Sequence, residues 1–353
     1  MSAVHKLPVE FNPPAANRNE PVVTLLSSDL SLAYLEDAEP SPLMGKLSNF
    51  WNGIIRTTKW LAVLALVGGY PAAVMNSHSI NADPITLSQA DGWADPHTGT
   101  LLTLLSRELS GPGWASDRAV WHPQARLNAL PAWQEGLTLA ASEFTRLRAE
   151  QTGTVTGIVD PDLLAASRLL APATDVDAIP RLHAAAEALQ TYEGRLNRET
   201  ATLLTGSEPF FAELDLYTKW VSEDLAHLSN AARTVSGWPA AETDIAAIYR
   251  ARAKAHVAAQ LISASIELDP TLIVSREASE AREALQVSLH RMATFNPLIV
   301  TSQGSTHPLL SDHPAALAFY SQETLRALDT FKASLVTQPS PAITYAEVET
   351  GKS

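Results

Sequence analysis

The chain has 353 residues, and because 46% of them are hydrophobic it can bury a core and form one large domain or two of ordinary size. Its formal net charge of -13 lies mainly in residues 60–353, which hold 20 basic and 32 acidic residues. This excess of negative charge argues against nucleic acid as a partner and against a basic membrane-docking patch. The absence of cysteine excludes disulfides, thiol nucleophiles and thiolate zinc sites.

The amino-terminal tail, residues 1–45, is polar and rich in proline. It cannot bury enough apolar surface to fold alone, so we expect a disordered tail. Within it, residues 28–36 have a short amphipathic helical pattern. This pattern is either a transient helix or a docking peptide for a cytoplasmic partner.

An uncharged run follows, from Trp60 to the residue before Asp83. Its length matches the roughly 17 to 25 residues that span a hydrocarbon core. Basic residues precede the run and the next one is Arg107, so the positive-inside rule places the amino terminus in the cytoplasm and the bulk of the chain outside. We expect a juxtamembrane segment and one transmembrane helix over 46–80, which contacts the lipid bilayer through residues 60–80. A cleaved leader and a buried helix of a soluble protein are the alternatives.

Residues 81–150 are rich in tryptophan and predict a membrane-proximal helical cap with helices near 98–110 and 131–150. Its four tryptophans lie within about 40 residues of one another and are the candidate binding residues: Trp93, Trp114, Trp121 and Trp133. Large rings of this kind can fill a loop-rich cap, form flat platforms for a protein or glycan, or contact the outer bilayer interface. The sequence leaves these three roles open.

Residues 151–336 have helical periodicity almost throughout, with helices expected at 160–170, 181–205, 211–235, 241–268, 272–295 and 313–335. Asp312 or Ser311 is expected to cap the last helix. Leucine recurs every seventh residue from Leu182 to Leu203, and a stripe at spacings of three and four begins at Phe211. A short turn at Gly206 separates the two stripes, so we expect an antiparallel hairpin with a seam of roughly 35 Å.

The expected fold class is therefore all-α: a single transmembrane helix followed by an elongated antiparallel bundle of about seven helices. Residues 337–353 are expected to form a disordered carboxyl terminus. No internal repeat is apparent.

Several segments resemble a known family. They are "GWADPHTGTLLTLLSRELSGPGWASDRA" at 92–119, "LNALPAWQEG" at 127–136, with a Gly expected to open a helix, and the stretch from "IYRARAKAHVAAQL" to "FNPLIVTSQGSTHPLL". In this order, after an apolar run, they resemble the bacterial inner-membrane family catalogued as domain of unknown function 2333. The resemblance implies a membrane-anchored, mainly helical envelope protein, but no activity and no functional residues.

Catalytic motifs are absent: the sequence has no HExxH, GxSxG, Gly-rich phosphate loop or dinucleotide fingerprint. His183 with Glu187 and Glu223 with His227 are four residues apart, a spacing that places each pair on one helical face. Such pairs are more typical of solvated faces than of metal sites. We therefore expect no catalytic residue, no metal and no cofactor.

Two classes of function remain. The first is a scaffold or assembly protein of the cell envelope that engages a membrane or periplasmic protein, or a second copy of itself. The second is an envelope enzyme or a binder of a glycan, metal or other small molecule at a site between helices. The missing catalytic signature favours the first.

Overall fold

The computed structural model describes residues 42–69, 80–86, 92–111, 113–119, 122, 128–172, 177–234, 240–297, 300–302 and 312–337. The tail up to residue 41, the second half of the expected membrane span, Trp121 and residues 338–353 lie outside this part of the chain. The chain divides into two units, Met1–Val63 and Leu64–Ser353.

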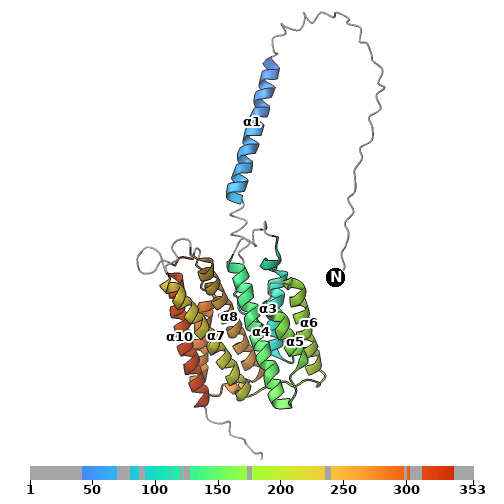
Figure 1. The fold of residues 1–353 in the computed structure, drawn as a ribbon, viewed down its shortest axis with the longest axis vertical. Coiled ribbons are helices and arrows are strands. Elements are labelled where there is room, and N and C mark those ends of the chain that lie inside the picture. Colours follow the sequence, from blue (N-terminus) through green and yellow to red (C-terminus); the bar gives the residue numbers. More distant parts are fainter. Residues whose placement is uncertain are drawn as a thin grey trace, which may run out of the picture. The chain divides into compact units, whose positions relative to one another are not determined.

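The first unit contains the helix α1 (Pro42–Leu64), which continues into a π-helical turn, Ala65–Gly69 (Figure 1). None of the helices in the described ranges is long and apolar enough to cross a bilayer. The span expected over 60–80 lies partly outside the described residues, which stop at Gly69 and resume at Ile80.

The second unit is all-α in its described residues, as predicted, and these residues form eight α-helices, close to the bundle of about seven that was expected. Their bounds are α3 (Pro96–Ser110), α4 (Ala129–Thr156), α5 (Pro161–Leu170), α6 (Ala178–Leu196), α7 (Ser207–Arg233), α8 (Glu242–Leu268), α9 (Arg276–Ala293) and α10 (His313–Val336). Short 3-10 turns, η3 (Ala115–Asp117) and η5 (Pro270–Leu272), join them.

Side-chain caps explain why several helices begin where they do. Asp95, Asp160, Ser275 and Asp312 each accept a hydrogen bond from a backbone N–H in the first turn of the helix that follows. Proline occupies an early position of α3, α5 and α10, where its missing N–H costs no helical hydrogen bond. The predicted cap of the last helix by Asp312 is confirmed.

Helix α8 lies at the centre of this unit and packs against α4, α9, α7 and α3 (Figure 1). Most of its residues are buried, which is why the helix carries only a weak amphipathic pattern. Its closest neighbour is α4, which approaches at Gly136, where a Cβ atom would lie 2.8 Å from the Cα of Arg250. Gly136 therefore permits helix contact and does not open a helix, since α4 already begins at Ala129.

The expected hairpin is wrong in two respects. The helix predicted over 181–205 ends at Leu196, and Gly206, with a φ of 98°, precedes α7 instead of capping the earlier helix. The two helices also have different principal partners: α6 packs on α5, and α7 packs on α10. An apolar stripe shows which face of a helix is buried but not which helix covers it, and here the neighbours in sequence are not the neighbours in space.

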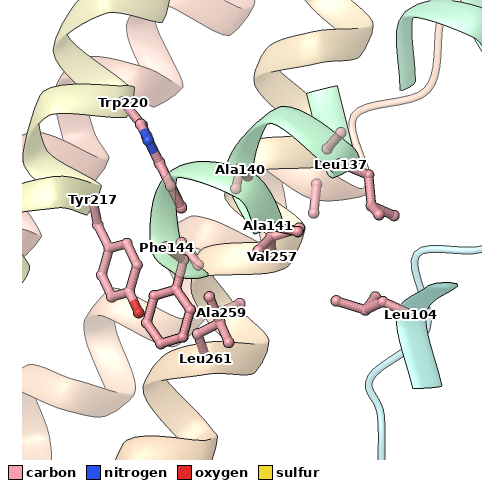
Figure 2. Close-up of a cluster of buried hydrophobic side chains, with 14 of the residues drawn as sticks. Leu104, Leu137, Ala140, Ala141, Phe144, Tyr217, Trp220, Val257, Ala259 and Leu261 are labelled. Carbon is pink, nitrogen blue, oxygen red and sulfur yellow. The ribbon is translucent and has the colours of Figure 1, made fainter. Parts of the chain in front are cut away.

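One hydrophobic core runs through the bundle, from Leu101 in α3 to Phe331 in α10. Figure 2 shows the part of it in which α3, α4, α7 and α8 meet, with Leu104, Phe144, Tyr217 and Leu261 among its members. The cap expected over 81–150 shares this core with the rest of the bundle, so the boundary expected near residue 150 does not separate two cores.

Candidate functional site

The tryptophans named as candidate binding residues occupy different environments. Trp133 is fully buried in α4, and its Nε1–H donates to the carboxylate of Glu108 at 3.0 Å. Trp114 is also buried, whereas Trp93 is half-buried. The rings of Trp114 and Trp133 therefore fill the core and offer no platform to a partner. Trp121 lies outside the described residues.

The strongest concentration of polar groups lies elsewhere, at the start of α3. Asp95 caps this helix, and its Oδ1 accepts the backbone N–H of His97 at 3.0 Å and lies 2.8 Å from the ring Nδ1 of His97. Thr98 donates to the other oxygen of Asp95 at 3.2 Å. Glu193 of α6 in turn accepts the backbone N–H of Asp95 at 3.2 Å. The sequence Asp-Pro-His thus folds into a capped helix start that fixes the imidazole ring.

Three further helices complete this site. Nε2 of His97 lies 2.9 Å from Oγ of Ser265 in α8, and this hydroxyl donates to Oε2 of Glu213 in α7 at 2.7 Å. Arg148 of α4 donates to Oε1 of Glu213 at 3.1 Å and to the carbonyl oxygen of Leu204 at 3.1 Å. We call Asp95, His97, Arg148, Glu213 and Ser265 the buried polar cluster, because each is at most 3% exposed.

Charges within the cluster set its protonation. Burial alone would lower the pKa of His97, but the carboxylates of Glu213 and Asp95 outweigh it and raise this pKa from 6.5 to about 9. Burial would raise the pKa of Asp95, but His97 and then Arg148 hold it at about 2, below its ordinary 3.8. The pKa of Glu213 is lowered mainly by His97 against the effect of burial. At neutral pH the cluster therefore holds two anions and two cations and has no net charge.

The order Asp95, His97, Ser265 has the hydrogen-bond pattern of a catalytic triad, in which an aspartate orients a histidine that activates a serine. The protonation state prevents that role, because an imidazolium has no lone pair with which to take a proton from Ser265. The serine proton is instead directed at Glu213. The arrangement joins four helices through satisfied charges and does not prepare a nucleophile.

The size of the neighbouring cavity also argues against a catalytic role for the buried polar cluster. The cavity beside the cluster, lined by His97, Arg148, Glu213 and Ser265 among others, measures about 10 Å³. A single water needs roughly this volume, so no substrate fits there. The other residues that line this cavity come from α7, the end of α8, the turn η5 with its cap Asp269, and residues 204–206.

The two histidine–glutamate pairs weighed as metal ligands, His183 with Glu187 and Glu223 with His227, belong to α6 and α7. In the described part of the chain no group of three or more histidine or acidic residues is placed to hold a metal ion. Glu223 lies 3.8 Å from Lys219, as expected for a solvated helical face, and His183 lines a groove on α6. His313, which follows the cap of α10, lies 3.0 Å from the hydroxyl of Thr301 through its Nδ1.

The groove that His183 lines is an open hollow on the surface of the described bundle. It lies between α3 and α6 and measures about 650 Å³. Its walls combine apolar groups with a few polar ones: Trp93, Leu102, Leu105, Leu109 and Ala186 with Thr103, Ser106, Arg107, Ser110, His183 and Gln190. The ring of Trp93 is held close by Gly99, where a Cβ atom would lie 2.7 Å from Cγ of the indole.

Comparisons with protein-family models, with curated proteins and with solved structures found no match to this chain. The site therefore has to be interpreted from its own geometry.

Sequence reasoning missed the buried polar cluster. Its members come from four helices and from positions as far apart as 95 and 265, so no local spacing joins them. A weaker signal was present: Glu213 directly precedes the apolar position Leu214 within the stripe of α7, and Arg148 lies among the buried positions of α4. A charged residue on a buried helical face requires a partner of opposite charge, so Glu213 and Arg148 could have been proposed as such a pair from the sequence.

Proposed function

We propose that this chain is a non-catalytic helical scaffold or assembly protein of the bacterial cell envelope. In this proposal the segment around residues 60–80 attaches it to the inner membrane, the amino terminus lies in the cytoplasm, and the bundle engages a protein partner in the periplasm. The resemblance to the inner-membrane family of domain of unknown function 2333 belongs to the same proposal.

The observation that carries the proposal is the state of the buried polar cluster. The arrangement most similar to a catalytic site is buried, electrically neutral and satisfied by hydrogen bonds between four helices. Such a network specifies one packing of the helices, which is what a rigid interaction body needs. Attachment to a membrane is supported by α1, whose large apolar side chains are exposed, with Phe50 65% and Trp60 64% accessible.

The proposal is tested by crosslinking the full-length protein in intact membranes and comparing it with the Ser265→Ala variant. A scaffold should give a stoichiometric crosslinked protein partner, or a second copy of the chain, and Ser265→Ala should retain it. A fluorophosphonate probe that labels the wild-type protein at Ser265 but not the variant would contradict the proposal, because it would show an activated serine.

The groove between α3 and α6 favours a second candidate function, the binding of a small molecule such as a glycan. Its volume lies in the range of about 300 to 1,000 Å³ that ligand pockets occupy, and an indole beside scattered hydroxyl and amide groups suits a sugar ring. Native mass spectrometry of the purified chain discriminates the two functions. A bound adduct that is lost in Ala186→Trp, which fills the groove, would support the binder; an adduct-free chain would support the scaffold.

A further inference from the structure

Helix α1 has two distinct faces between residues 50 and 59. At roughly 100° per residue, Phe50, Ile54 and Leu61 fall on one side, and the flanking residues Trp51 and Ile55 widen that side to about 140°, an arc in which Thr58 is the one polar residue. All five apolar residues are exposed, from 40% for Ile54 to 65% for Phe50. The apolar face is therefore broad and accessible.

The opposite face is polar and basic. Asn52, Arg56 and Lys59 lie together there, about half a turn away from Ile54. The sequence of α1 contains three basic residues and no acidic residue, and the first acidic residue after it is Asp83. This local positive charge contrasts with the acidic balance of residues 60–353, which had argued against a basic membrane-docking patch.

The character of the helix changes at Trp60. From this residue to Gly69 every side is apolar, and Trp60, Leu64 and Val67 are exposed. Ten residues extend about 15 Å at 1.5 Å per residue, which is half of a hydrocarbon core of about 30 Å. This end can enter the acyl region, but by itself it does not cross it.

We propose that α1 binds an anionic lipid surface, with its apolar face in the acyl boundary and Arg56 and Lys59 at the acidic head groups. A large apolar face opposite lysine and arginine is the composition of helices that lie in the membrane interface. The occupant is an anionic bilayer and not a protein groove because the polar face carries only positive charge. The inference rests on the proposed membrane attachment and adds the lipid class and the face that recognises it.

The test is flotation of the full-length protein with two kinds of vesicle, one of phosphatidylcholine alone and one of phosphatidylcholine mixed with phosphatidylglycerol. Stronger binding to the mixed vesicles, weakened by added salt, is expected. The double variant Arg56→Gln, Lys59→Gln should lose roughly fivefold in vesicle affinity for each charge removed. Ile54→Ser should weaken binding to both kinds of vesicle.

A matched control removes two basic residues from the bundle surface, Arg146→Gln with Arg276→Gln, and should leave binding unchanged. Circular dichroism should show an intact bundle in every variant, since the substituted α1 side chains are exposed.

A failure of the lipid inference and a failure of the proposed membrane attachment would give different results. Equal flotation with both vesicles, unaffected by Arg56→Gln and Lys59→Gln, would overturn the inference while membrane attachment stands. An equal loss in the control pair would overturn the assignment to α1. No flotation with either vesicle would overturn both the inference and the proposed attachment.

Discussion

The neutral charge of the buried polar cluster predicts a large penalty when one of its anions is removed. Glu213→Gln keeps the size and the hydrogen-bonding oxygen of the side chain but leaves Asp95 alone against the cations His97 and Arg148. An uncompensated charge at a buried ion pair costs about 3 to 5 kcal/mol of unfolding free energy. Urea denaturation of the full-length protein, followed by circular dichroism, measures this difference.

The matched control is Asp215→Asn, two residues further along α7. Asp215 is exposed and pairs with Lys332, so its removal should cost less than about 1 kcal/mol. The double variant Glu213→Gln, His97→Gln removes one anion and one cation and restores neutrality, so it should be more stable than the sum of the single effects predicts. Strict additivity, or a Glu213→Gln effect no larger than that of the control, would refute the reasoning.

Three further predictions concern pH, packing and an unpaired hydroxyl. The pKa of His97 is raised in the folded protein, so protonated His97 should stabilise the fold by about 3 kcal/mol. This stabilisation should be complete below pH 6.5 and lost as the pH rises through about 9. Urea midpoints measured over this pH range should therefore vary less in His97→Gln than in the wild type. Gly136→Ala should lower the unfolding free energy by about 1 to 3 kcal/mol, because the added Cβ would meet the backbone of Arg250. Its control is Gly53→Ala, whose added Cβ would have no atom within 4 Å and should leave the thermal midpoint of the bundle unchanged. Tyr217→Phe should be neutral or slightly stabilising in thermal melts, since the buried hydroxyl of Tyr217 has no hydrogen-bond partner in the described structure; a loss of more than about 1 kcal/mol would show an interaction that this geometry lacks.

Much of the helical architecture could be predicted from the sequence. Its helical periodicity placed helices close to α3, α4, α5, α7, α8, α9 and α10. The cap at Asp312 is likewise local, because the side chain and the N–H that it accepts are three residues apart.

The errors have a common cause in tertiary structure. The leucine repeat continued to Leu203 although α6 ends at Leu196, because a leucine in an irregular segment can also pack against the core, as the half-buried Leu203 does. The α6–α7 hairpin was expected because short connections usually join antiparallel neighbours, but in the structure α7 packs mainly against α10. The complete buried polar cluster is not encoded in any local spacing, since its members come together only where four helices meet.

The protonation state of His97 decides whether the buried polar cluster is a neutral structural network or holds an activated serine. The most direct measurement is a nitrogen-15 NMR titration of the histidine side chains, with the His97→Gln variant used to assign the signal. We predict that both ring nitrogens of His97 are protonated at neutral pH and that the ring titrates near pH 9. A neutral ring at pH 7, with an unprotonated Nε2 facing Ser265, would contradict this prediction and would make the serine a candidate nucleophile.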